Sequence, residues 1–140
     1  MVPDVNVWGV LLATLSTLVV GSLWYTPRVF GRRWMRLARV DEERAAQRGA
    51  WPVVVTVLVT AVTAWVLAGA TTIAHDWYGG TSFLLSAVVT GLLLWAGFTA
   101  ARLVTHDAFE GRPAALTVLN VGHELLTVLV MAVVIGLLGP

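Results

Sequence analysis

Four long, mainly apolar runs dominate this sequence, and each is long enough to cross a lipid bilayer as a helix. They occupy residues 5–25, 51–74, 82–105 and 114–138. A helix needs about 20 apolar residues to span the hydrocarbon core. The chain is 58% hydrophobic and only 12% charged, far below the charged share of a soluble domain. The sequence therefore predicts an all-α membrane protein, a single domain over residues 1–140, with four transmembrane helices in an up-down bundle.

The basic residues lie on only two of the connections between these runs. All nine are arginines; seven lie between Arg28 and Arg48, and Arg102 and Arg112 flank the third connection. Loops that carry an excess of arginine stay on the cytoplasmic side of a membrane. We therefore expect the first and third connections in the cytoplasm and both termini outside. The absence of cysteine excludes disulfides, thiolate metal sites and a cysteine nucleophile.

Residues 28–48 form the longest polar stretch and have an amphipathic pattern. Phe30, Trp34 and Leu37 fall on one helical face. The other sides carry Arg32, Arg33, Arg36 and Arg39. This pattern predicts a short amphipathic interfacial helix on the inner leaflet, with its arginines against anionic headgroups. Nucleic-acid binding is not expected, because acidic residues 41–43 interrupt the basic stretch.

Ionisable residues enter the third and fourth runs on either side of one short turn. Such a residue costs about 2.5–3.5 kcal/mol at the centre of a spanning helix, so it seldom lies there without a partner or a task. Arg102, His106 and Glu110 share a face of the third helix at four-residue spacing. Counted from the turn, Arg102 lies about 14 Å deep and Glu124 about 18 Å deep. An Arg102–Glu124 ion pair is within reach if the two faces turn towards each other.

Three functional interpretations of this polar cluster stay open beside a structural one. The first is a pocket in the cytoplasmic half, built from helices one, three and four, that binds or transports a small amphiphilic or lipophilic molecule around Arg102 and Glu124. Its expected lining residues are Trp24, Tyr25, Trp95, Arg102, Asp107 and Asn120. The structural alternative is that Arg102 and Glu124 only neutralise each other, while Asn120 and the histidines hydrogen-bond between helices.

The second interpretation is a membrane-embedded acid–base enzyme, such as a cyclase, isomerase or hydrolase of a lipophilic substrate. Glu124 would donate a proton, and His123 or His106 would act as the base. The third is a metal site using His106, Glu110, His123 and Glu124, but no recognised metal-binding spacing is present. We therefore expect neither a metal nor a cofactor.

Three pairs of small residues at four-residue spacing favour close contact between helices. They are Ala87 and Gly91, Ala96 and Ala100, and Ala132 and Gly136. This spacing lets two membrane helices approach closely, either within one chain or between copies. Together with the small size of the bundle, it predicts a homo-oligomer in the lipid bilayer.

Two separated motifs resemble a known family. The first is Leu23-Trp24-Tyr25-Thr26-Pro27 followed by Phe30-Gly31 and Trp34, and the second is Gly97-Phe98, Phe109-Glu110-Gly111-Arg112-Pro113 and Asn120-Val121-Gly122. Together they resemble the small bacterial membrane proteins catalogued as domain of unknown function 1761. The resemblance implies four helices in a bacterial inner membrane and no particular activity. His123 stands where that family usually has Tyr, so this chain carries additional ionisable groups there.

Overall fold

The computed structural model describes residues 3–47 and 49–140, and every regular element within them is a helix. In chain order they are α1 (Val7–Trp24), α2 (Gly31–Ala38), α3 (Glu42–Gln47), α4 (Trp51–Tyr78), α5 (Phe83–Leu94), the π-helical segment η1 (Trp95–Ala100), α6 (Ala101–Phe109) and α7 (Ala114–Leu138). Four helices are long and apolar enough to cross a membrane: α1, α4, α7 and the continuous helix Phe83–Phe109 formed by α5, η1 and α6. The predicted all-helical membrane fold is confirmed.

Two of the spans extend further than expected. The helix predicted to end at residue 74 continues to Tyr78, and the one predicted to end at residue 105 continues to Phe109. Gly79 and Gly80 both have positive φ and end the former, because glycine adopts this conformation without steric cost. His75 lies in the last turn of α4, with its Nδ1 3.1 Å from the Ser86 hydroxyl.

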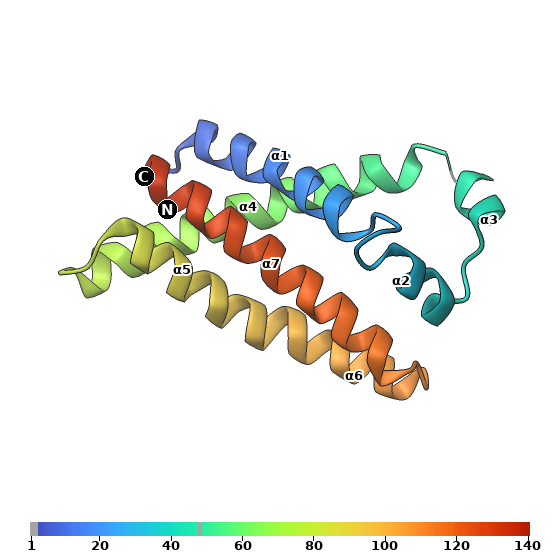
Figure 1. Ribbon diagram of the computed structural model, residues 1–140. Coiled ribbons are helices and arrows are strands. Elements are labelled where there is room, and N and C mark those ends of the chain that lie inside the picture. The colour runs from blue at the N-terminus through green and yellow to red at the C-terminus, as the bar shows by residue number, and fades with distance from the viewer. Residues whose placement is uncertain (1–2, 48) are drawn as a thin grey trace.

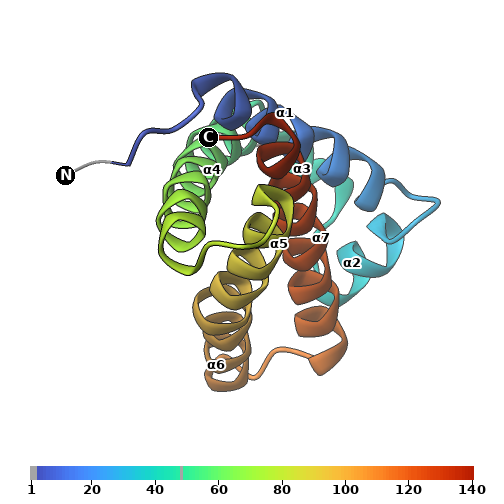
Figure 2. The same ribbon diagram turned by 90° about the vertical axis from the view of Figure 1, so that its left-hand side faces the viewer.

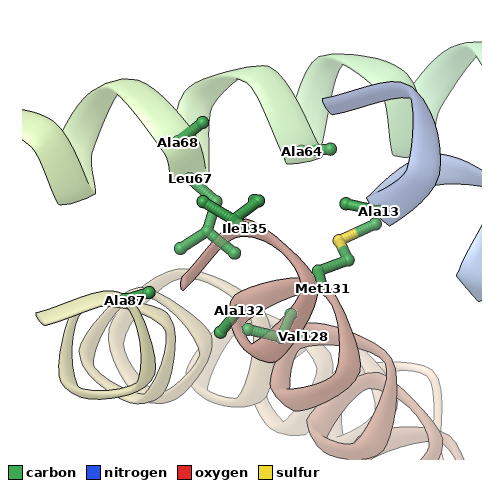
Figure 3. Packing of buried hydrophobic residues seen from close by; sticks show 9 residues of the cluster. All are labelled: Ala13, Ala64, Leu67, Ala68, Ala87, Val128, Met131, Ala132 and Ile135. Atoms are coloured by element: carbon green, nitrogen blue, oxygen red, sulfur yellow. The ribbon is translucent and has the colours of Figure 1, made fainter. Parts of the chain in front are cut away.

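The helix α7 is central, because it contacts α1, α4, α5, α6 and α2 (Figures 1 and 2). The buried apolar cluster lies in one half of the bundle and consists of Ala13, Ala64, Leu67, Ala68, Ala87, Val128, Met131, Ala132 and Ile135. Figure 3 shows the Met131 side chain extending from α7 towards Ala13 of α1. Five of the nine residues are alanines, so the helices approach closely here. We call residues 7–16, 64–78, 83–91 and 128–138 the packed half.

The remaining parts of the spans, residues 17–24, 51–63, 92–109 and 114–127, form what we call the open half. In Figure 1, α4 and α7 diverge here, towards α3 and the turn between α6 and α7. Most side chains in the first third of α4 are exposed, whereas its buried residues all lie at or beyond Ala64. The arginines of α2 and Arg112 of the α6–α7 turn lie at this end. Which side of the membrane it faces stays a prediction.

Small residues at the predicted spacing are used within the chain. A Cβ on Gly91 would lie 3.2 Å from Val128 and 3.3 Å from Ala132, and one on Gly136 would lie 2.7 Å from the Cα of Leu84. These glycines therefore allow α5 and α7 to pack together. The predicted homo-oligomer stays a prediction.

Candidate ligand-binding cleft

The turn that follows α1 folds the chain back onto the bundle. The helix ends at Trp24 before Pro27, whose ring disfavours helical backbone at the preceding residue. The Gly31 N–H donates to the Thr26 carbonyl at 2.9 Å. A side chain on Gly31 would overlap the carbonyl oxygen of Tyr25, so only glycine fits at the start of α2. The first sequence motif is thus a tight turn.

This turn places the apolar face of α2 against α7. The Trp34 indole N–H donates to Asn120 Oδ1 at 3.1 Å, and its ring meets Tyr25 edge-on at 5.4 Å. Phe30 and Leu37 are partly buried on the same side. The exposed residues are Arg32, Arg33, Arg36 and Arg39, whereas Arg48 of the predicted amphipathic segment lies outside the described residues. The apolar face of α2 is the one predicted from the sequence, but α7 rather than lipid covers part of it.

The end of α1 also contacts the middle of α7. The His123 ring lies 4.9 Å from that of Tyr25 and 5.9 Å from that of Trp24, centre to centre. The preceding residue, Gly122, also faces the Trp24 ring, since a Cβ there would lie 3.6 Å from it. The two sequence motifs, almost a hundred residues apart, therefore meet in one place.

A cleft of about 620 Å³ opens beside this contact, between α1, α4 and α7. Its volume is within the usual range for small-molecule sites. Its main polar residues are Thr17, Ser22 and Tyr25 from the α1 side, Thr56 and Thr60 from α4, and His123, Glu124 and Thr127 from α7. The site thus lies in the open half, where the helices diverge.

Two polar atoms on α7 have no hydrogen-bond partner among the described residues. They are His123 Nε2 and the Thr127 hydroxyl, both buried and both on residues that line the cleft. Several other membrane threonines return a hydrogen bond to their own helix, as Thr17, Thr56 and Thr60 do. Buried polar groups are nearly always paired, so the two unpaired atoms on these cleft-lining residues are unusual.

Glu124 supplies the charge of the cleft. Its carboxylate lies 3.5 Å from His123 Nδ1, and its side chain is 41% exposed, compared with 15% for His123. The nearby Tyr25, just beyond the end of α1, is held in its neutral form: burial raises the pKa of its phenol to about 12, with a further contribution from the Glu124 charge. Like an ordinary phenol, it is neutral at physiological pH and can donate a hydrogen bond.

The predicted partner of Glu124 lies elsewhere. Among the described residues Glu124 pairs with His123 and not with Arg102. Arg102, His106 and Glu110 do share one face of α6, but all three are exposed. The proposed Arg102–Glu124 ion pair is therefore wrong for this structure.

The π-helical segment explains this difference. Buried positions of α5 include Ala87 and Gly91, and continuing at 3.6 residues per turn leads to about residue 102. Because η1 accommodates one extra residue, the inward face of α6 passes through Leu103 and Asp107 instead. The extra residue turns Arg102 away from α7.

Asp107, expected in the pocket, ties two helices together outside the cleft. It is 5% exposed and accepts a hydrogen bond from Thr117 at 2.7 Å. Arg112 lies 3.7 Å from the same carboxylate and also pairs with Glu110. These contacts fix the turn between α6 and α7.

Trp95 lies on the other side of α7 from the cleft. Its indole N–H donates to the Val121 carbonyl at 3.3 Å. With Phe98 and residues of α4 it lines a second, largely apolar cleft of about 410 Å³. Trp24 and Asn120 lie next to the first cleft without lining it, so of the six predicted ligand-binding residues only Tyr25 is among its lining residues.

The sequence did not single out Thr127, Thr56 or Thr60 as ligand residues. Thr127 was detectable as a polar residue one turn beyond His123, whereas the threonines of α4 look like ordinary packing residues until α4 is placed. No group of three or more potential metal ligands occurs within residues 3–47 and 49–140.

The fold defines a small helical membrane protein with four spans and a cleft in one half of the bundle. The chain belongs to the family described as "Protein of unknown function (DUF1761)", whose model matches residues 8–136. No curated protein and no solved structure matches the chain.

Proposed function

We propose that this protein binds a small lipophilic molecule with a basic head in the cleft between α1, α4 and α7. The fuller form of the proposal is that the protein also transports this molecule. The observation that carries the proposal is the row of polar groups that α7 presents there. His123 Nε2 and the Thr127 hydroxyl lack protein partners, and the Glu124 carboxylate lies between them in sequence. A mainly apolar cavity with a few such groups is the usual form of a ligand site.

The charge of the cleft favours a cationic head. Arg102 is outside it, and among the side chains that the structure describes no arginine pairs with Glu124, whereas the imidazole of His123 does. A ligand that carries an amine or another cation would pair with the carboxylate. Its apolar body would contact Leu18 and Val53, and Tyr25 would add an aromatic face, which attracts cations.

Two probes of equal shape and opposite charge test this proposal. Tetraphenylphosphonium is a lipophilic cation, and tetraphenylborate is its anionic counterpart. We expect the purified protein in detergent to bind the cation and to melt at a higher temperature in its presence. The Glu124→Gln variant keeps the side-chain volume but loses the charge, so its affinity for the cation should fall about tenfold or more. Isothermal titration calorimetry measures the affinity of the wild type and of the variant for the cation.

Glu110→Gln is the matched control, because Glu110 is a carboxylate outside the cleft that pairs with Arg112. It should bind the cation as the wild type does. Equal binding of both probes, or unchanged binding by Glu124→Gln, would contradict the proposal. Uptake of the cation by proteoliposomes then separates transport from binding alone.

The pairing of His123 with Glu124 favours a second candidate function, acid–base catalysis on a lipophilic substrate. A carboxylate beside Nδ1 favours the tautomer with its proton on that nitrogen, which leaves Nε2 free to accept one. Nε2 is the imidazole atom without a protein partner. The roles differ from those expected, since Glu124 would orient the base rather than donate the proton itself.

Proton exchange in heavy water tests this second candidate. The protein is incubated in D₂O with a lipid extract of the expression host, and the lipids are analysed by mass spectrometry. An active base removes a carbon-bound proton and a deuteron returns, so a lipid gains mass with the wild type and with His106→Gln. The same gain should be absent with His123→Gln. Equal labelling with all three proteins, or labelling with none, would remove acid–base catalysis as a candidate.

A further inference from the structure

A second site lies on the opposite flank of the turn that follows α1. It is a slot of about 340 Å³, lined by Trp24, Phe30, Arg33, Ala115, Val118 and Leu119. None of these residues lines the cleft that holds Glu124, so the slot is separate from that cleft. Apart from Arg33 and the indole nitrogen of Trp24, its lining side chains are apolar.

The position of the slot along α7 places it near the membrane surface. Ala115, Val118 and Leu119 lie in the first two turns of a spanning helix, within about 8 Å of its start. Val118 is 71% exposed, as expected for a side chain that faces lipid. This is the level at which the headgroup and the upper acyl chain of a phospholipid lie.

The α2 side of the slot carries positive charge. Between Asp4 and Asp41 the sequence has five arginines and no acidic residue. Arg33 is exposed at the slot, and Arg32 and Arg36 are exposed on the same helix. Trp24 also lines the slot, and its buried indole N–H has no hydrogen-bond partner among the described residues.

We propose that this slot binds an anionic phospholipid, whose phosphate pairs with Arg33 and whose acyl chain lies against Phe30, Val118 and Leu119. A guanidinium binds a phosphate through two parallel hydrogen bonds, and an apolar groove beside it suits the attached chain. A zwitterionic lipid of the same chain length would bind more weakly, because its headgroup carries no net charge for the arginines.

Native mass spectrometry tests the proposal on the full chain. The detergent-solubilised protein is mixed with equal amounts of phosphatidylglycerol and phosphatidylcholine that carry identical acyl chains. The wild type should retain the anionic lipid in preference, and Arg33→Gln should reduce that preference about fivefold. Arg28→Gln removes an equal charge from the same surface outside the slot, so it should leave the preference nearly unchanged.

Two further arms test the chain-binding part of the slot. Ala115→Leu fills the groove without altering charge, and it should lower retention of the anionic lipid even if Arg33→Gln folds poorly. Glycerol phosphate, the headgroup without a chain, should not displace the bound lipid. Equal losses for Arg28→Gln and Arg33→Gln would show diffuse surface attraction instead of a site. Displacement by glycerol phosphate would show that the slot recognises a phosphate and not a lipid. Either result overturns the proposal.

Discussion

The packed and open halves of this bundle are built from the same four spans, yet they use side chains differently. In the packed half, alanines and Gly136 bring α5 and α7 so close that a Cβ on Gly136 would lie 2.7 Å from the backbone of Leu84. In the open half, Gly97 has no atom within 4 Å of the position of its missing Cβ. The comparison indicates that close packing in the packed half stabilises the fold. The open half instead leaves room for polar groups whose burial is unfavourable for stability.

The largest effect is expected in the packed half. Gly136→Ala forces the added methyl group against the Cα of Leu84, so α5 and α7 must move apart. Overpacking of this kind costs about 1–3 kcal/mol of unfolding free energy. The melting temperature of the detergent-solubilised protein should fall accordingly. An unchanged melting temperature would mean that the two helices can separate freely, and the contrast between the halves would disappear.

The same substitution should have the opposite, smaller effect in the open half. Gly97→Ala places a methyl group in open space within η1 and reduces the conformational freedom of the unfolded chain. Alanine is favoured over glycine in a helix by about 0.5–1 kcal/mol. The melting temperature should therefore rise slightly, and binding of the tetraphenylphosphonium probe should be retained because Gly97 lies outside the first cleft. A loss of stability as large as that of Gly136→Ala would show that the π-helical turn itself requires glycine.

The sequence predicted the fold of this protein well, because membrane spanning depends on run length and composition. The four runs became the four spans, and Pro52 stands in the first turn of α4 as helix geometry allows. Two helix ends lie further along the chain than predicted. Local features, such as the paired glycines after Tyr78, set these ends rather than the average hydrophobicity of the run.

The candidate site was predicted less completely, for two physical reasons. Counting helical faces assumes an unbroken 3.6-residue repeat, and the extra residue in η1 turned Arg102 outwards. Side-chain spacing also gives no information about which helix lies opposite. Asn120 was correctly expected to hydrogen-bond, but its partner is Trp34 of α2. Glu124 and His123 do line a cleft, although the opposing wall comes from α4, which was not among the helices expected to build the pocket.

The absence of a side chain at Gly31 has a consequence for how this protein responds to its surroundings. Because a Cβ on Gly31 would overlap the backbone of Tyr25 and Thr26, the start of α2 lies directly against the end of α1. The Tyr25 ring contacts both Trp34 of α2 and His123 of α7. We therefore expect a change in the tilt of the arginine-bearing α2 to reach His123 and Glu124 through Tyr25.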